Sequence, residues 1–284
     1  MVAYQNSLSL VVIYMSVCFL IYILSLLLRR RAAYLHPKLV VRRKKSKLNG
    51  AKHKKNFVPH QINILFVIAH PDDECMFFGP SLLNAGYNKA NCRVSLLCLS
   101  EGNFYGEGDR RRKELFQSCE VFGIHWKDVK IVDHCDLQDN PAAFWDVNLV
   151  AKEILKVVKN KKINQIITFD CFGASGHKNH ISVYRGARHL VVGHHLPKGM
   201  RVSSLETVSL FRHYITFLDL PFSLMSAALR GSRVILSSPM EVWTAQRAMK
   251  AHWSQFVWFR VLNILFSRYL VVNTLRPINK NSPT

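Results

Sequence analysis

Apolar runs that alternate with helix-like stretches dominate residues 62–192 and constrain the fold most strongly. Three of them are INILFVIA at Ile62–Ala69, RVSLLCL at Arg93–Leu99 and INQIITF at Ile163–Phe169. The first has four β-branched positions and no polar alternation beyond Asn63, which is typical of a strand buried on both faces. Strands that alternate with helices of about 10–15 residues favour βαβ units. The sequence therefore predicts an α/β fold, a mostly parallel Rossmann-like sheet with helices on both faces.

The segments between the strands carry helical periodicity and turn signals. Gly123 is placed to end one helix as a C-terminal cap, and the Gly-rich loop at 102–108 precedes that helix. A short strand is expected at Lys130–Val132, and helices are expected near Gly79–Gly86, Arg110–Phe122, Phe144–Lys159 and Ile181–Val192.

The amino-terminal region contains 21 consecutive uncharged residues, Leu8–Leu28. At about 1.5 Å per residue, a helix of this length spans a hydrocarbon core of roughly 30 Å. A cleaved signal peptide is the alternative, but it has a basic start and an apolar core of about 7–15 residues. No Lys or Arg precedes this run, so we expect an uncleaved transmembrane helix at residues 8–28.

Basic residues follow this segment at once. Residues 1–60 contain 12 Lys and Arg and no acid, out of 39 basic and 18 acidic residues in the chain. The positive-inside rule therefore places residues 1–7 in the lumen and a basic linker, residues 29–60, in the cytosol, where it can contact anionic lipid. The remaining chain is only mildly basic, so no nucleic-acid partner is expected. The seven cysteines are scattered and include no C-x-x-C pair, which fits free thiols in a reducing compartment.

Two polar clusters follow predicted buried strands. His70, Asp72, Asp73 and Glu74 follow the first strand, and His177 and His180 lie after the strand that ends at Phe169. Ligands of parallel sheets bind beyond the carboxyl ends of the strands. A carboxylate with imidazoles can hold zinc and leave a position open for water, and a second carboxylate can act as general base. A solvated acidic turn and two surface histidines are the alternatives.

The two clusters also resemble a known family. AHPDDE at Ala69–Glu74 and GASGHKNH at Gly173–His180 closely resemble the motifs of the LmbE-like/PIG-L superfamily of zinc-dependent de-N-acetylases, over roughly residues 62–275. The pattern TFDxxGxSGHxNH at Thr168–His180 and the tail at Trp258–Leu275 resemble the branch that acts on N-acetylglucosaminyl-phosphatidylinositol. This resemblance implies a glycolipid substrate, an acetate product, a role in GPI-anchor biosynthesis and residence in the endoplasmic reticulum membrane.

The resemblance implies a role for each residue that matches a motif. His70, Asp73 and His180 would bind Zn²⁺ or another divalent metal, Asp72 would be the general base, and His177 would steady the tetrahedral intermediate. Arg111, in an R-x-x-E pattern with Glu114, would contact substrate; an ordinary basic helix face is the alternative. Lys178-Asn179 stands where bacterial relatives commonly have Pro-Asp, which leaves open what orients the histidines.

The carboxyl-terminal part of the chain is apolar with few charges. We expect a deacetylase domain at residues 61–250 and an amphipathic helix and tail at residues 251–284. Trp253–Val272 fits either an interfacial helix on the membrane or a helix packed on the sheet. Two other functions remain open at this stage: deacetylation of another lipid- or small-molecule-linked N-acetyl sugar, and a non-catalytic membrane adaptor.

Overall fold

The computed structural model describes residues 9–29, 61–86 and 92–284. The chain divides into two units, Met1–His60 and Gln61–Thr284. In the first unit the structure describes one helix, Ser9–Arg29, which has a mean hydropathy of 2.7 and is long and apolar enough, by length and composition, to cross a membrane. This helix coincides with the predicted span. The expectations for residues 1–7 and for all of the linker except Arg29 lie outside the described residues.

The second unit is built on a seven-stranded sheet with the order β3-β2-β1-β4-β5-β7-β6. The pairs from β3 to β5 are parallel, whereas β7 runs antiparallel to both β5 and β6. The prediction of a mostly parallel sheet is therefore confirmed. The strands are β1 (Ile62–Ile68), β2 (Cys92–Cys98), β3 (Val129–Ile131), β4 (Gln165–Phe169), β5 (Arg201–Leu205), β6 (Arg233–Leu236) and β7 (Val272–Pro277).

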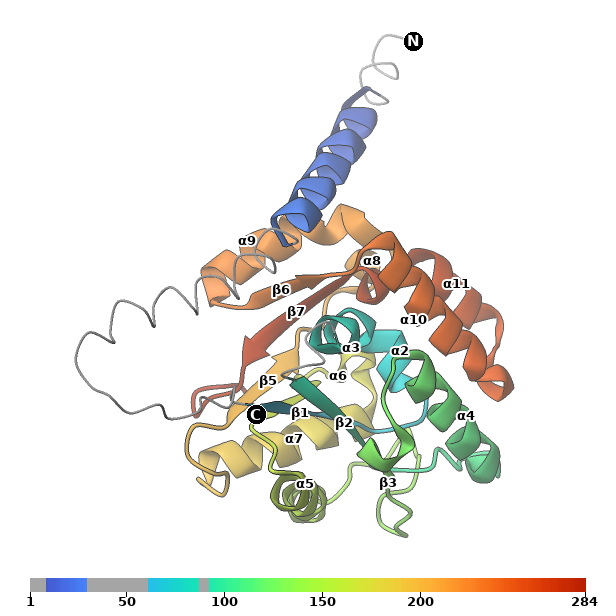
Figure 1. Ribbon diagram of the computed structural model, residues 1–284, viewed down its shortest axis with the longest axis vertical. Helices are drawn as coiled ribbons and strands as arrows, with labels where there is room; N and C mark the ends of the chain where they lie inside the picture. Colours follow the sequence, from blue (N-terminus) through green and yellow to red (C-terminus); the bar gives the residue numbers. More distant parts are fainter. Residues whose placement is uncertain (1–8, 30–60, 87–91) are drawn as a thin grey trace, which may run out of the picture. The chain divides into compact units, whose positions relative to one another are not determined.

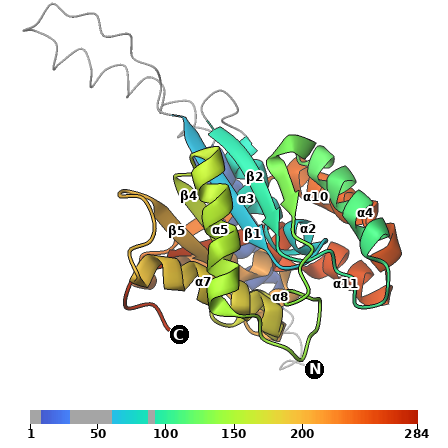
Figure 2. The ribbon, with the colours of Figure 1, turned by 90° about the horizontal axis from the view of Figure 1, so that it is seen from below.

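Helices cover both faces of this sheet, with α5 and α7 on one side and α3, α4 and α10 on the other (Figures 1 and 2). The predicted helices are present, with ends shifted by a few residues. The α-helices are α2 (Asp73–Phe77), α3 (Gly79–Gly86), α4 (Gly108–Val121), α5 (Val147–Lys161), α6 (Gly173–Gly176), α7 (Lys178–Val192), α8 (Leu210–His213), α9 (Leu220–Arg230), α10 (Pro239–Ala251) and α11 (Trp258–Phe266). Short 3₁₀ turns are η1 (Trp126–Asp128), η2 (Thr216–Asp219), η3 (Trp253–Gln255) and η4 (Arg268–Leu270).

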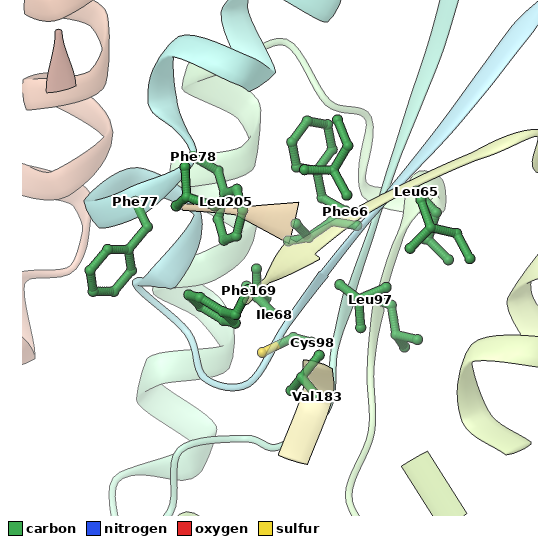
Figure 3. Packing of buried hydrophobic residues seen from close by; sticks show 14 of the residues in the cluster. Leu65, Phe66, Ile68, Phe77, Phe78, Leu97, Cys98, Phe169, Val183 and Leu205 are labelled. Carbon is green, nitrogen blue, oxygen red and sulfur yellow. The ribbon is translucent and has the colours of Figure 1, made fainter. Parts of the chain in front are cut away.

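The core lies on the central strands and fixes the loops that follow them. Phe66 of β1 packs edge-on against Phe78, whose ring in turn lies 5.1 Å from that of Phe169 of β4 (Figure 3). All three side chains are buried. Because Phe78 directly follows α2, this packing holds the AHPDDE segment against the sheet. The seven cysteines form no disulfide, as the scattered spacing predicts.

The carboxyl-terminal segment differs from its expected form. Residues 251–284 belong to the compact unit Gln61–Thr284, and the expected domain bounds at residue 250 stay a prediction. The expected single helix at Trp253–Val272 is divided into η3, α11 and η4, and β7 begins at Val272. The division has a physical cause at Arg268, which is fully buried and pairs with Asp219 at 2.9 Å instead of facing water on a helix surface.

Candidate functional site

The two sequence motifs meet at one edge of the sheet. The AHPDDE segment leaves the carboxyl end of β1 and the GASGHKNH segment leaves that of β4, and these strands are paired in parallel. The chain crosses from β1 to β2 on one side and enters β5 from β4 on the other, so the motifs flank the point where the strand order reverses. Ligands of open α/β sheets bind at this position. His177 caps the amino end of α7 and His180 lies in its first turn, so the H-x-x-H stretch opens a helix.

Asp73 is held in place by the backbone of its own turn. Its Oδ2 accepts hydrogen bonds from the backbone N–H of Ala69 at 3.0 Å and of His70 at 2.9 Å. Its Oδ1 lies 3.1 Å from His180 Nε2. Burial opposes ionisation, but the charge and hydrogen bond of His180, with a contribution from His70, bring the pKa of Asp73 below its ordinary value. The carboxylate is therefore ionised and faces the two imidazoles.

The hydrogen bonds of His70 and His180 fix which ring nitrogens carry protons. His180 Nδ1 lies 2.8 Å from the Gly173 carbonyl oxygen, which can only accept, so Nδ1 donates. His70 Nε2 lies 2.9 Å from Asn179 Oδ1, and this atom is the amide oxygen because it also accepts from the Asn140 N–H. Without a cation between them, the Asp73 carboxylate raises the pKa of His180 against the effect of burial, and His180 Nε2 then carries a proton that it donates to Asp73. When both rings are neutral, as metal-binding histidines are, His70 Nδ1 and His180 Nε2 each carry a lone pair, and the two atoms lie 3.3 Å apart.

Two facing lone pairs beside a carboxylate fit a cation between them. His180 Nε2 lies 3.1 Å from Asp73 Oδ1 and 3.3 Å from His70 Nδ1, and His70 Nδ1 lies 3.9 Å from the other carboxylate oxygen, Asp73 Oδ2. Four ligands at about 2.0–2.2 Å around a tetrahedral zinc ion are roughly 3.4 Å apart. The residues present therefore suit zinc in number, chemistry and spacing. The Gly173 carbonyl and Asn179 amide provide the outer hydrogen bonds that metal-binding histidines require.

His177 lies beside this cluster but has a different hydrogen-bond pattern. Its ring centroid is 4.7 Å from that of His70, and its Nδ1 accepts from the Asn179 backbone N–H at 3.2 Å. The proton of the neutral ring is then on Nε2, so that atom is a hydrogen-bond donor. Burial and the neighbouring imidazoles lower the pKa of His177 to about 4, which keeps the ring neutral at pH 7. A neutral donor at this position can stabilise an oxyanion.

Asp72 has an unusual backbone and a cationic partner. Its φ of 113° and ψ of −21° lie in a region that non-glycine residues rarely adopt. Its carboxylate forms an ion pair with Arg260, which reaches it from α11. Burial raises the pKa of Asp72 above its ordinary value, against the opposing charges of Arg260 and Arg111. A carboxyl group with a raised pKa is suited to take up and release a proton.

Arg111 is engaged by protein groups on three sides. Its guanidinium donates to the Gly102 carbonyl at 2.7 Å, the Pro71 carbonyl at 3.0 Å and the Asp139 carboxylate at 2.9 Å. The second oxygen of Asp139 lies 3.2 Å from His70 Nε2. Arg111 thus ties the AHPDDE turn to Asp139 and supports the orientation of His70. The substrate contact expected for Arg111 stays a prediction.

Glu74 organises the turn from the opposite side. Its Oε1 accepts from His252 at 2.7 Å and from the Ser118 hydroxyl at 2.5 Å, and its Oε2 accepts from the Asp72 N–H at 3.1 Å. The Glu74–His252 pair is buried. Burial opposes both charges, but each partner outweighs it, raising the pKa of His252 and lowering that of Glu74. The neighbouring Cys75 donates to the Asp72 carbonyl, and burial keeps its thiol protonated by raising its pKa.

Asp139, Asn179, His252 and Arg260 were not identified as site residues from the sequence. Asn179 lies inside the H-x-x-H motif, and Asp139 lies in the loop after β3, at the same end of the sheet, so position in the fold is a usable signal for both. His252 and Arg260 come from a region more than 170 residues after the first motif in the chain. No local pattern connects them to it.

The fold and the site together define a Rossmann-like α/β domain with the donor set of a metal centre at the carboxyl ends of its strands. The solved structure of N,N'-diacetylchitobiose deacetylase from Pyrococcus horikoshii has a similar fold, with a TM-score of 0.55 and 15% identity, covering 77% of this chain and 84% of that one. A family model described as GlcNAc-PI de-N-acetylase, PIG-L, matches residues 65–191.

Two relatives extend this match over most of the chain. A Bos taurus protein named N-acetylglucosaminyl-phosphatidylinositol de-N-acetylase is 44% identical over 211 residues, which are 74% of this chain and 81% of that protein. A Schizosaccharomyces pombe protein with the same name, qualified as probable, is 41% identical over 75% of this chain and 86% of its own. The chain belongs to the PIG-L family of de-N-acetylases.

Proposed function

We propose that this chain hydrolyses the acetamide of N-acetylglucosaminyl-phosphatidylinositol, releasing acetate and glucosaminyl-phosphatidylinositol, the second step of GPI-anchor biosynthesis. The observation that carries the proposal is the placement of His70 Nδ1, His180 Nε2 and the Asp73 carboxylate within 3.1–3.9 Å in a chain 44% identical to a de-N-acetylase of that name.

The metal ligands in this proposal are His70, Asp73 and His180, and the ion is Zn²⁺ or another divalent metal. A bound zinc ion would supply Lewis acidity and a water of lowered pKa. His177 is assigned elsewhere because its Nδ1 accepts a backbone N–H, which leaves its Nε2 protonated and without a lone pair.

Different residues of the chain transfer the proton and stabilise the negative charge. Asp72 accepts the proton of the attacking water, since its raised pKa favours protonation at the moment of attack. His177 donates from Nε2 to the oxygen of the tetrahedral intermediate. The protonated Asp72 carboxyl then supplies the proton that the leaving amine needs. Arg111 holds the turn and Asp139, and we include substrate contact as a second role for it.

The location in this proposal is the endoplasmic reticulum membrane. The helix Ser9–Arg29 anchors the chain as a single span, and three arginines at its end and directly after it favour a cytosolic catalytic unit: Arg29, Arg30 and Arg31. The basic linker, residues 29–60, adds attraction to anionic lipid.

The test is acetate release from N-acetylglucosaminyl-phosphatidylinositol by detergent-solubilised full-length protein, measured beside Asp72→Asn, His177→Ala and His180→Ala. We expect chelator-sensitive release by the wild type. Asp72→Asn and His177→Ala should bind metal but turn over at least about 100-fold more slowly, whereas His180→Ala should lose metal. Metal-bound wild-type protein that is inactive on this lipid would move the substrate to another N-acetyl sugar. Inactive protein without metal would favour a non-catalytic adaptor.

A further inference from the structure

Helix α11 has its polar and apolar sides reversed relative to a helix of a water-soluble domain. Asn263 faces inward and is 2% exposed, and Arg260 reaches the Asp72 carboxylate. Trp258 and Leu265, by contrast, are 74% and 58% exposed. Surface helices of soluble domains bury their apolar stripe and expose their polar one. The outer side of α11 is therefore made for contact with something other than water.

The apolar surface continues from α11 onto neighbouring elements. His213 at the end of α8 lies 3.2 Å from the Ser267 hydroxyl just after α11, so the two helices are adjacent (Figure 1). Leu210 and Phe211 of α8 are both about three-quarters exposed. We name the exposed apolar residues of α8, η3 and α11 the α8–α11 face: Leu210, Phe211, Trp253, Trp258, Val261, Leu262, Leu265 and Phe266.

The part of the chain that contains the α8–α11 face is strongly basic. Residues 207–284 contain nine Lys and Arg but only two acids, Asp219 and Glu241. Asp219 is fully buried, paired with Arg212 and Arg268, and Glu241 is 6% exposed in the capping box of α10. The surface of this part of the chain thus combines large apolar and aromatic side chains with cationic ones and carries no exposed acidic side chain.

We propose that the α8–α11 face docks on the surface of a bilayer that contains anionic lipid. Interfacial helices bury Trp, Phe and Leu at the boundary of headgroups and acyl chains, and basic residues add attraction to anionic lipid. A second copy of the chain fits less well, because it would bring two basic segments together, and residues 207–284 offer no exposed acidic side chain to pair with them. The proposal rests on the proposed function in one respect, namely that the substrate which docking brings to the site is a membrane lipid.

Docking has a direct consequence for access to the site. Arg260 projects from the inner side of α11 to Asp72, the carboxylate assigned as base, while Val261 and Leu262 next to it face outward. The helix that meets the lipid therefore also borders the reacting groups. A headgroup could enter the site without its acyl chains leaving the bilayer.

The test is tryptophan quenching in the full-length protein reconstituted into vesicles of phosphatidylcholine and phosphatidylserine with brominated acyl chains. Trp253 and Trp258 lie on the face, and Trp126, 63% exposed on η1, serves as the matched control. We expect Trp253→Phe with Trp258→Phe to lose roughly two-fold or more of the bromine-dependent quenching, because indole rings at an interface lie near the upper acyl chains. Trp126→Phe should retain it.

Equal quenching in the double variant and the wild type would overturn the proposal. Tryptophan emission that does not respond to bromine would also overturn it. If that emission changed on dilution of the protein instead, Trp258 would be covered by a second copy of the chain and not by lipid. The quenching measurement does not depend on catalysis. Loss of docking can therefore be told apart from loss of the proposed deacetylase activity, which the acetate assay measures. As a second measurement, Leu265→Gln should slow acetate release from vesicle-embedded substrate several-fold and leave the rate on detergent-solubilised substrate unchanged. Equal rates in vesicles would also count against docking.

Discussion

Asn179 is predicted to determine metal affinity although it binds no metal itself. Its side chain is fully buried and makes three hydrogen bonds: from His70 Nε2 at 2.9 Å, from the Asn140 N–H at 3.2 Å and to the Ala143 carbonyl at 2.9 Å. The first of these keeps the proton on Nε2 of His70 and leaves the Nδ1 lone pair facing Asp73. Asn179→Ala removes all three bonds.

The expected magnitudes follow from these contacts. Three bonds worth about 0.5–1.5 kcal/mol each give a loss of roughly 3 kcal/mol in the free energy of unfolding, which lowers Tm by about 6–12 °C in a domain of this size. Removing an outer hydrogen-bond partner of a metal ligand costs about 10–100-fold in affinity. Asp139 Oδ1, 3.2 Å from His70 Nε2, remains as a second acceptor. We therefore expect a loss of zinc affinity near the tenfold end.

The assay is competition for zinc with a chromophoric chelator, together with thermal unfolding of the metal-free protein. Asn179→Asp keeps an acceptor for His70 and places a carboxylate against the Ala143 carbonyl, so its affinity should stay near wild type while its stability falls. Asn148→Ala, an exposed position on α5, is the control for both measurements. If Asn179→Ala binds zinc as tightly as the control, Asn179 does not set the protonation of His70 and the argument fails.

Three further predictions concern stability. Gly186→Ala would place a Cβ 2.3 Å from a Val150 side-chain carbon and should cost about 1–3 kcal/mol in chemical denaturation, whereas Gly86→Ala, with no neighbour within 4 Å, should cost nothing. Burial, with the charge of Arg268, lowers the pKa of His213 from 6.5 to about 4. The fold therefore tolerates His213 only as a neutral ring, and the free energy of unfolding falls by about 3 kcal/mol as the pH drops from 6.5 to 4. His213→Gln should reduce this dependence of stability on pH. His252→Ala leaves Glu74 buried and unpaired and should cost about 3–5 kcal/mol; an unchanged unfolding midpoint would contradict the pairing.

The strands and the longer helices as far as α7 could be predicted because each carries its signal locally, whereas the short helices α2 and α6 were not predicted. The apolar run at Ile62–Ala69 has no alternative to a buried strand, and β1 occupies Ile62–Ile68. The last strands carry no such signal. β7 has the sequence VNTLRP, in which polar Asn273 and Thr274 are buried because Asn273 bonds to Ser81 and to the Phe77 carbonyl. A polar sequence of this kind is typical of a loop, and it can be assigned to a buried strand only when its distant hydrogen-bond partners are known.

The site shows the same division between local and distant information. Asp72, Asp73, His177 and His180 could be proposed from sequence because each stands in a motif at a strand end. Arg260 could not, since its polar partner is 188 residues away and its neighbours suggested only an amphipathic helix. The sequence indicated an amphipathic helix here, and only the fold shows that Arg260 on its polar side reaches Asp72.

The backbone of Asp72 allows a last prediction that separates strain from charge. The backbone N–H groups of the turn are bonded to neighbouring carboxylates. Asp73 accepts hydrogen bonds from the N–H groups of Ala69 and His70, and Glu74 accepts one from the N–H of Asp72. Asp72 makes no capping hydrogen bond of its own at the start of α2, so its carboxylate is left for Arg260 and for proton transfer.

Asp72→Gly and Asp72→Ala both remove the carboxylate and should both be inactive, but they differ in the backbone. At φ 113° a Cβ is strained and glycine is not, so Asp72→Gly should be the more stable variant by about 1–2 kcal/mol, the reverse of the usual preference for alanine near a helix. The comparison is made by urea unfolding of the metal-free proteins. Equal stability, or a more stable Asp72→Ala, would mean that the turn stores no strain at this residue, and that its geometry is set by the bonds of Asp73 and Glu74 alone.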